Sequence, residues 1–300
     1  MYYQLLADGV NLLYKSNKIT WSAESNTNGA TLSFESYHSL RMGQIVNFFI
    51  DGYECFRGVI VKCNESKLKY TYTCFDYAFY LKNEVVVQFN KVDITSALSS
   101  LLLEHDIKHA IVNIPTKIDK FYAGESIINI IDDMIDMAMN DQGLYYFREL
   151  RGNMLYLELN TEKYINPSVV ILDDINIDYS IENVKNKVLV MSSAEKATSV
   201  NAEAYDDESK WWYGLLQKVE KVDDKELAQA KNIADNMLTK LNKVEHSTTV
   251  RVLALERAEL ILPHRLIYFN NKKLNGWYRI RSVSHDIVNG RHIVDIGLEW

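Results

Sequence analysis

Two stretches of this chain follow the same pattern, and they decide the fold. The first runs Gly43-Gln-Ile-Val-Asn-Phe-Phe-Ile50, turns at Asp-Gly, continues as Tyr-Glu-Cys-Phe-Arg-Gly-Val-Ile-Val-Lys, and ends with Lys69-Tyr-Thr-Tyr-Thr-Cys-Phe75. The second runs Pro263-His-Arg-Leu-Ile-Tyr-Phe269, then Trp277-Tyr-Arg-Ile-Arg-Ser-Val-Ser-His-Asp-Ile287, and ends with Arg291-His-Ile-Val-Asp-Ile-Gly-Leu-Glu-Trp300. Short alternating segments separated by Asp-Gly, Asn-Gly and other polar turns predict a three-stranded antiparallel meander. A chain that builds the same small β unit twice is more often a structural ring component than an enzyme.

The rest of residues 1–88 also has the pattern of β structure. In the segment 30–36, Leu32 and Phe34 alternate with polar residues and share one face, as in a half-buried strand. Five or six short strands with tight polar turns indicate a small antiparallel barrel or sandwich. We therefore expect a first barrel over residues 1–88, completed by about residues 172–192.

Helical spacing of apolar residues begins after Asn90. Asp93 or Thr95 can cap a helix that continues through His105, and a second helix is expected from Ser126 to a C-cap at Gly143. A hairpin follows, with its turn at Arg-Gly-Asn 151–153. We expect residues 89–171 to form a small α/β domain inserted in the first barrel.

Residues 193–300 are expected to form a second β-barrel with one helix. The segment 193–210 is polar and predicts a loop. Asp223 and Glu226 fit a capping box at the start of a helix over residues 223–243. The fold class is therefore mainly β with an α+β insert: two small antiparallel β-barrels per chain and a small α/β domain in the first.

Composition excludes several classes of protein. The chain has 300 residues, 47% of them hydrophobic, and a formal net charge of −7 with no basic stripe, so nucleic-acid binding is not expected. Its N-terminus lacks the pattern of a signal peptide, and its apolar runs are too short to cross a membrane. The odd number of cysteines predicts free, packed thiols in a reducing compartment, and these are Cys55, Cys63 and Cys74.

The sequence contains no catalytic constellation that we can identify. His105 and His109 have the i, i+4 spacing of helical metal ligands but not the HExxH pattern, and His285 and His292 could face each other across a hairpin. In both pairs packed or surface histidines are the more usual interpretation than ligands. Adjacent acids cannot flank one scissile bond and are expected to cap or to be solvated; they are Asp132-Asp133, Asp173-Asp174, Asp206-Asp207 and Asp223-Asp224.

One aromatic cluster, Trp211-Trp212-Tyr213, lies in a polar context. Core packing or a subunit contact is favoured there over sugar stacking. We therefore expect no catalytic, cofactor-binding or metal-binding residues, and no cofactor.

The chain resembles the baseplate hub proteins of contractile phage tails, in the shorter form of Gram-positive prophages and phage-tail-like bacteriocins, which are related to the hub part of type VI secretion spike proteins. The resemblance covers nearly the whole chain, and the phrase G-x-Y-x-I-x-x-V-x-H near the C-terminus is its most characteristic motif. Pro263-His264 departs from the Gly that the family often has there, which a strand start tolerates. The resemblance to the family rests on five segments: Gly43 to Phe49 with Phe56-Arg-Gly58-Val; Cys74 to Leu81; Ser126 to Gly143 with Leu144-Tyr-Tyr-Phe; Tyr213-Gly214-Leu-Leu; and Gly276 to His285.

The resemblance implies a homotrimer in which six barrels form a pseudo-sixfold ring. Such a ring would join the hexameric tail tube to the threefold spike and would contact other baseplate proteins. It implies synthesis in a bacterial host cytoplasm and a place in the virion or tail-like particle, with no membrane partner. The genome can pass through the lumen without specific binding, so we expect lumen-facing side chains to be acidic or neutral.

Two alternatives stay open at this point. One is a tail-associated cell-wall hydrolase or peptidase, although the chain leaves little room for such a domain. The other is a carbohydrate-binding module that uses Trp211 and Trp212. The sequence does not separate a phage from a bacteriocin particle.

Overall fold

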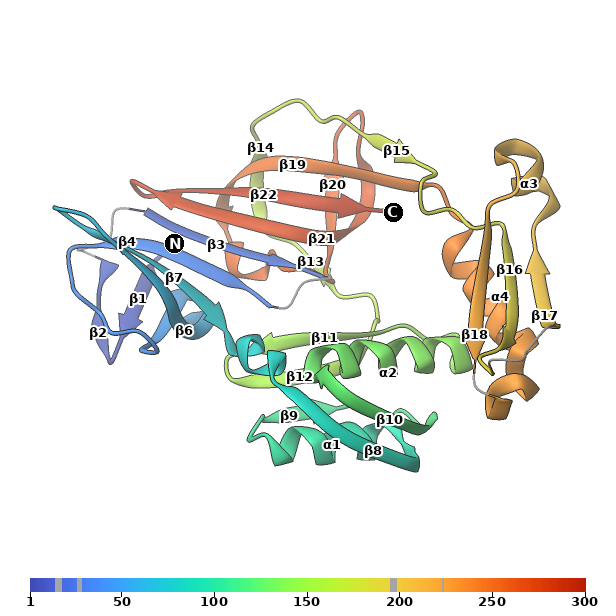
Figure 1. The fold of residues 1–300 in the computed structure, drawn as a ribbon. Helices are drawn as coiled ribbons and strands as arrows, with labels where there is room; N and C mark the ends of the chain where they lie inside the picture. The colour runs from blue at the N-terminus through green and yellow to red at the C-terminus, as the bar shows by residue number, and fades with distance from the viewer. Residues whose placement is uncertain (14–17, 26–28, 195–198, 223) are drawn as a thin grey trace.

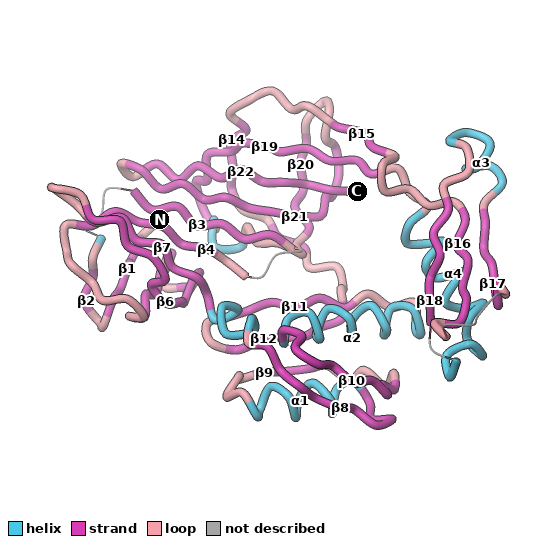
Figure 2. The backbone as a smooth tube through the Cα atoms, in the orientation of Figure 1, coloured by secondary structure: helices cyan, strands magenta, loops and turns pink. Residues whose placement is uncertain are grey.

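The structure is a computed structural model that describes residues 1–13, 18–25, 29–194, 199–222 and 224–300. It is mainly β with few helices, as expected (Figures 1 and 2). A large curled antiparallel sheet contains both ends of the chain, and three smaller sheets lie beside it. Among the described residues, none of the helices has the length and hydrophobicity needed to span a lipid bilayer.

The two repeated stretches form the same three-stranded meander. In the first, β6 pairs antiparallel with both β5 and β7; in the second, β21 pairs antiparallel with both β20 and β22. Each meander also has a register shift in its second hairpin, between Ile60 and Lys62 and between Ile280 and Ser282, at different distances from the turn. The first meander has another shift, between Phe48 and Phe49, that the β20–β21 pairing does not repeat. The bounds are β5 (Ile45–Ile50), β6 (Tyr53–Glu65), β7 (Tyr70–Asp76), β20 (Leu266–Asn270), β21 (Asn275–Val288) and β22 (Arg291–Glu299).

Both meanders belong to one continuous sheet. Its main path runs β14-β19-β22-β21-β3-β4-β7-β6-β5-β1-β2, and the pairing of β3 with β21 joins the N-terminal half to the C-terminal half. The remaining strands, β13, β15 and β20, pair at the C-terminal end of this path. The bounds not yet given are β1 (Tyr3–Ala7), β2 (Val10–Asn11), β3 (Lys18–Glu24), β4 (Thr31–Ser36), β13 (Tyr164–Ile165), β14 (Ser168–Ile171), β15 (Asp178–Ser180) and β19 (Glu245–Glu256).

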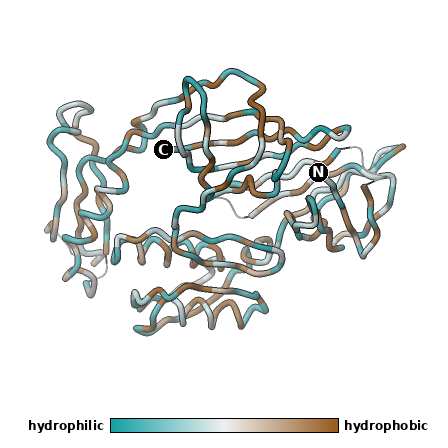
Figure 3. The backbone as a smooth tube through the Cα atoms, turned by 180° about the vertical axis from the view of Figure 1, so that it is seen from behind, coloured by the Kyte–Doolittle hydropathy of each residue, from teal (hydrophilic) through white to brown (hydrophobic). Residues whose placement is uncertain are grey.

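The large sheet buries two separate cores on one of its faces. The N-terminal core contains Trp21, Phe34 and Phe48, and the C-terminal core contains Ile280 and Val294, all nearly inaccessible to solvent. Alternation along each strand sends every second residue to this face, and Figure 3 shows hydrophobic and hydrophilic residues alternating along the strands. Burial of these apolar side chains is the main favourable term holding each half together.

The α/β unit expected after residue 89 has its own core and its predicted helices. Asp93 caps α1 (Ile94–Glu104) by accepting the Ser96 N–H, and Ser126 caps α2 (Ile127–Gln142), which ends at Gly143 in the left-handed conformation. The predicted hairpin is also confirmed, as β11 and β12. The strands are β8 (Glu84–Asp93), β9 (His109–Ile111), β10 (Lys117–Ser126), β11 (Tyr146–Arg151) and β12 (Met154–Leu159).

A third unit differs from our expectation for residues 193–300. Strands β17-β16-β18 form a sheet of their own, and α4 packs on it through Val188, Ala204 and Ala234 rather than on the large sheet. The segment 193–210, predicted as a loop, contains β17 and the start of α3. Small Ala side chains on β17 give little strand signal. The bounds are β16 (Lys187–Ser192), β17 (Val200–Tyr205), β18 (Gln217–Val222), α3 (Asp207–Tyr213) and α4 (Ala230–Leu241).

Two boundaries also need correction. Residues 172–192 do not complete the N-terminal half, because β14 and β15 pair with β19 in the C-terminal half and β16 pairs with β17 and β18. The helix predicted over 223–243 begins at Ala230, after the 3-10 helix η3 (Asp224–Gln229), and Gln229 makes no side-chain capping bond. Asp223, the predicted cap, lies outside the described residues.

The third unit contacts the α/β unit where one side of α4 meets the C-terminal part of α2. The side-chain amides of Asn232 and Asn236 in α4 donate to the carbonyls of Asp141 and Asn140, at 2.8 Å and 3.0 Å. Lys240 adds an exposed ion pair with Asp136. Figure 1 shows α4 beside the C-terminal end of α2.

Candidate functional site

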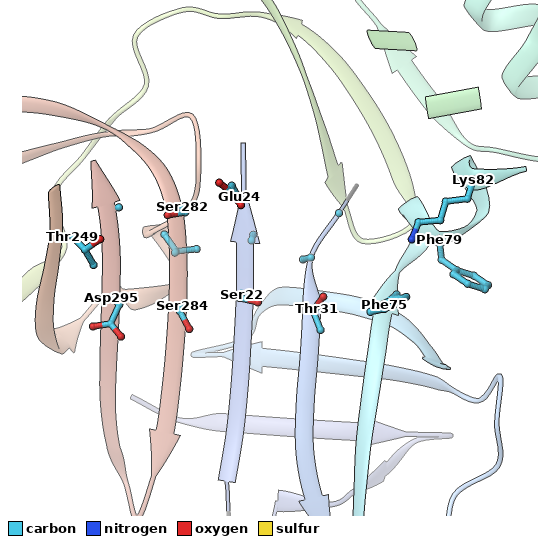
Figure 4. Close-up of a pocket in the computed structure, with 15 residues that line it drawn as sticks. Ser22, Glu24, Thr31, Phe75, Phe79, Lys82, Thr249, Ser282, Ser284 and Asp295 are labelled. Carbon is cyan, nitrogen blue, oxygen red and sulfur yellow. The ribbon is translucent and has the colours of Figure 1, made fainter. Parts of the chain in front are cut away.

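The candidate site is the polar face of the large sheet, on the side opposite the two cores. Ser22 of β3 lies directly across from Ser284 of β21, and Ser284 lies across from Asp295 of β22. Thr31 and Thr249 extend the face onto β4 and β19 (Figure 4). These side chains line a shallow cleft of about 420 Å³ that crosses the boundary between the two halves.

Several charged side chains on this face form ion pairs with one another. Asp286 accepts the Thr20 hydroxyl at 2.8 Å and lies 3.4 Å from the Lys18 ammonium. Similar exposed pairs are Lys69–Glu35, Arg251–Asp295 and Arg281–Glu24. Exposed pairs contribute little to stability. Their effect is that the face carries hydroxyls and balanced charges, with no strong field of one sign.

The titratable side chains that line this cleft together with its hydroxyls are Glu24, Lys82 and Asp295. A serine nucleophile needs an adjacent base such as His, and the cleft lining contains neither His nor Cys. The arrangement can contact a polar surface or a passing polymer. Glu24 and Asp295 of the lining are each in an ion pair with an arginine.

A short 3-10 helix, η2 (Tyr77–Lys82), forms one wall of the cleft. Asp76 holds it in place, because its carboxylate accepts the N–H of Ala78 at 3.0 Å and that of Ala30 at 2.7 Å. Burial raises the pKa of Asp76 to about 6. Sequence reasoning did not single out this residue, although an Asp directly after a strand and before a helical turn is a recognisable capping signal.

His285 and His292 face each other across the β21–β22 hairpin, as the sequence suggested they could. Nδ1 of His285 lies 2.9 Å from Nε2 of His292, and the outer nitrogens contact the Ile261 carbonyl at 3.0 Å and the Tyr3 hydroxyl at 3.2 Å. Both rings are buried, and Trp21 stacks on His285 with the ring centroids 4.3 Å apart. Burial lowers the pKa of both histidines, that of His292 to about 4.

The geometry of this pair is that of a hydrogen bond. Two ligands of one zinc ion must both point at the metal from about 2.0–2.1 Å, whereas these nitrogens point at each other. In the described ranges there is no group of three or more His, Cys, Asp or Glu that could hold a metal.

The other predicted features are scattered over the surface and the cores. His105 is the C-cap of α1 and His109 lies in β9, so the two do not share a helix face. The cysteines are free thiols, and burial raises the pKa of Cys55 and of Cys74 to about 12. Such thiols are poor nucleophiles at neutral pH.

Acids that are adjacent in sequence have different partners, and ion pairs rather than the expected capping or solvation account for the first pair. Asp132 pairs with Arg148, whereas its neighbour Asp133 bonds Lys120 and Tyr122. Asp206 caps α3 by accepting the Ser209 N–H. Among the described contacts, none brings the carboxylates of Asp173 and Asp174 together.

The aromatic cluster on α3 is exposed, so core packing is the wrong interpretation for it. Trp211 and Trp212 keep 76% and 65% of their surface accessible, and their rings meet edge to face at 4.5 Å. A subunit contact or a glycan contact both remain compatible with this position.

Solved structures with the same fold are tail proteins. The chain is similar to the 43 kDa tail protein of prophage MuSo2 from Shewanella oneidensis, with a TM-score of 0.71 and 11% identity over 99% of this chain and 97% of that one. It is similar to the tail protein of Neisseria meningitidis MC58, with a TM-score of 0.74 and 13% identity over 99% and 96%. The c3393 protein of E. coli, a component of the type VI secretion system with structural similarity to T4 tail proteins gp27 and gp5, matches with a TM-score of 0.58 and 10% identity over 98% and 76%.

The fold is therefore that of phage tail proteins, with structural similarity to a type VI secretion component. The chain itself belongs to the YQBQ-like family, whose model matches residues 19–299. Among curated proteins no sequence matches it significantly. The resemblance noted in the sequence is confirmed at the level of family and fold.

Proposed function

We propose that this chain is the structural hub of a contractile tail baseplate. The observation that carries the proposal is the repeated meander, β5-β6-β7 and β20-β21-β22, with the same antiparallel pairing and a register shift in each second hairpin, in one continuous sheet. Two equivalent units per chain let three chains present six equivalent positions. Each half would act as one β-barrel unit, with the α/β unit of residues 89–171 inserted between them.

The trimer would adapt one symmetry to another. Its six units would contact the hexameric tail tube, while its threefold axis would match the spike, and the remaining surface would contact other baseplate proteins. The chain would be made in the host cytoplasm and carried in a phage or bacteriocin particle. Its role would be mechanical, without an enzymatic step.

The polar face would line the lumen of this ring. Its serine and threonine hydroxyls and its paired charges support that placement, because a surface without excess positive charge does not retain DNA phosphates. The expectation of an acidic or neutral lumen thus becomes a proposal about named residues, Ser22, Ser284 and Asp295.

Assembly with purified partners tests the proposal. The chain, its cognate tube protein and its cognate spike would be mixed, and the masses of the complexes measured by native mass spectrometry. We expect three copies of the chain per spike trimer and one tube hexamer per complex. A chain that stays monomeric with both partners at concentrations well above about 1 μM, the range of a weak interface, contradicts the proposal.

The exposure of Trp211 and Trp212 favours one second candidate, a glycan-binding role. It predicts binding to cell-wall glycan that is lost in Trp211→Ala and Trp212→Ala, whereas a subunit contact predicts loss of assembly in the same variants. A turbidity assay on peptidoglycan tests the remaining alternative, a cell-wall hydrolase.

A further inference from the structure

The hydrogen bonds around His285 and His292 connect parts of the chain that no strand pairing connects. The large sheet curls from β22 through β21, β3, β4, β7, β6 and β5 to β1, and β1 and β22 do not pair with each other among the described strands. Tyr3 of β1 and His292 of β22 nevertheless meet at 3.2 Å. This side-chain contact bridges the two ends of the curl and closes the N-terminal half.

The carbonyl of Ile261 fixes the direction of the whole chain of bonds. A carbonyl only accepts, so Nε2 of His285 carries a proton and its Nδ1 is an acceptor in the neutral ring. His292 must then donate from Nε2, which leaves its Nδ1 to accept the Tyr3 hydroxyl. The Met1 sulfur, 3.8 Å from the same hydroxyl, is a much weaker acceptor. When both histidines are neutral, all three bonds are satisfied only in these tautomers.

Protonation of either histidine is unfavourable in this arrangement. A single proton on His292 keeps the hydrogen bonds but puts a positive charge in a buried site, and the nearby N-terminal amine opposes it. A second proton puts two N–H groups head to head across the 2.9 Å contact.

The charged groups around the pair offer no compensation. On β3 the neighbour is the uncharged Trp21 ring, and on β21 the Asp286 carboxylate points to the opposite face, where it bonds Thr20 and Lys18. Near β1, Asp51 interacts with Tyr3 and accepts the Tyr2 N–H.

We propose that Tyr3, His292, His285 and the Ile261 carbonyl form an acid-sensitive latch that holds β1 against the β21–β22 hairpin and releases it on acidification. The sign follows from linkage. Because the folded pKa values lie below the ordinary value of 6.5, the stability contributed by the latch is complete above 6.5 and is lost as the pH falls toward about 4. The consequence is local opening of β1 before the rest of the sheet unfolds.

Hydrogen exchange measured by mass spectrometry on the full chain tests the latch. Between about pH 7.5 and about pH 5, after correction for intrinsic exchange rates, we expect exchange in residues 1–12 to rise about tenfold in the wild-type chain. In His292→Gln we expect less than about a threefold rise, because Gln can donate to His285 and accept from Tyr3 but does not titrate. His105→Gln, outside the latch, should behave as the wild type does.

A second measurement does not depend on whether the variant folds. Nitrogen-15 NMR of wild-type histidines should show His285 and His292 neutral with the proton on Nε2 at neutral pH. A proton on Nδ1 of His285, or wild-type exchange in residues 1–12 that does not change with pH, would overturn the proposal. Equal pH dependence in the wild type and in His292→Gln would do the same.

Discussion

Gly297 of β22 lies directly opposite Ser282 of β21, so closely that a Cβ on Gly297 would stand 2.2 Å from the Ser282 Oγ. The first meander has a matching close approach, because a Cβ on Gly58 of β6 would stand 2.1 Å from the Phe75 carbonyl oxygen. Both glycines lie near the register shift of their own meander. The contacts differ in kind, because Gly58 on the middle strand approaches backbone and Gly297 on the third strand approaches a side chain.

The two glycines should respond differently to substitution. Gly58→Ala meets backbone that cannot rotate away, so we expect a loss of about 1–3 kcal/mol in the free energy of unfolding. Gly297→Ala meets a hydroxyl that can change rotamer, and we expect a smaller loss of about 0.5–1.5 kcal/mol. Urea denaturation measures both.

A double variant separates the two causes. In Ser282→Ala the obstructing oxygen is gone, so adding Gly297→Ala should cost almost nothing further. The same Ser282→Ala change should leave the cost of Gly58→Ala unaltered, since the two sites do not touch. Full additivity between Ser282 and Gly297 would show that the contact is not the cause.

The buried carboxylate of Asp76 predicts a pH effect of opposite sign to that of the histidine latch. Its folded pKa, about 6, lies above its ordinary value of 3.8, so its contribution to stability is complete below 3.8 and is lost as the pH rises through 6. Asp76→Asn removes this titration. The variant also cannot accept both the Ala30 and the Ala78 N–H, which costs about 1–3 kcal/mol.

We therefore expect Asp76→Asn to be less stable than the wild type at every pH, with the gap narrowing between about pH 4 and pH 7. Urea denaturation at several pH values measures the gap. A gap that widens with pH would mean that the two N–H bonds outweigh burial and keep the Asp76 pKa low.

The ion pair between Arg265 and Glu149 connects the loop before β20 to the α/β unit. The guanidinium lies 2.7 Å from the carboxylate, and the two side chains are only 11% and 14% exposed. Removing one member of a buried pair costs about 3–5 kcal/mol. Because Glu149 also contacts Arg151, we expect Arg265→Met to lower the free energy of unfolding by about 3 kcal/mol, the small end of this range. Urea denaturation measures this loss.

An exposed ion pair on α4 provides the matched control. Lys231 and Asp235 lie 2.7 Å apart, but their side chains are 67% and 53% exposed. Lys231→Met should therefore change the free energy of unfolding by no more than about 0.5 kcal/mol. Similar losses at the two sites would argue against a structural role for Arg265.

Positive charge on the polar face should increase the retention of DNA by the proposed ring. Ser22→Lys and Ser284→Lys together add two cations per chain at adjacent positions on paired strands. If this face lines the lumen, we expect salt-dependent retention of DNA in reconstituted particles, with trimer formation unchanged. Gln217→Lys and Gln229→Lys, at two exposed neutral positions of the third unit, add the same two charges per chain and control for net charge. Equal retention in that control would exclude a lumen position for Ser22 and Ser284.

Local signals in the sequence account for the elements that we predicted correctly. The capping residues Asp93 and Ser126 and the terminal Gly143 act on the backbone within one helical turn, so they are visible without the fold. The meanders were visible because alternation and Asn-Gly turns are equally local. The start of α4 could not be predicted from the sequence, because tertiary contacts determine where that helix begins.

Long-range pairing accounts for what the sequence did not reveal. The β3–β21 pairing joins residues separated by more than two hundred and fifty positions, and it places Ser22 beside Ser284. The latch likewise needs Tyr3, from the first strand, beside His292, from the last. The histidine pair was visible as a spacing, but its partners became visible only with the topology.

The contact between α4 and α2 has a further consequence if the chain has the mechanical role that we propose. Amide-to-carbonyl bonds from Asn232 and Asn236 involve no group that titrates and no charge that salt can screen. Of the three interactions described here, the Lys240–Asp136 ion pair is the one that high salt concentration weakens. The contact between these two helices should therefore depend little on pH and on salt concentration.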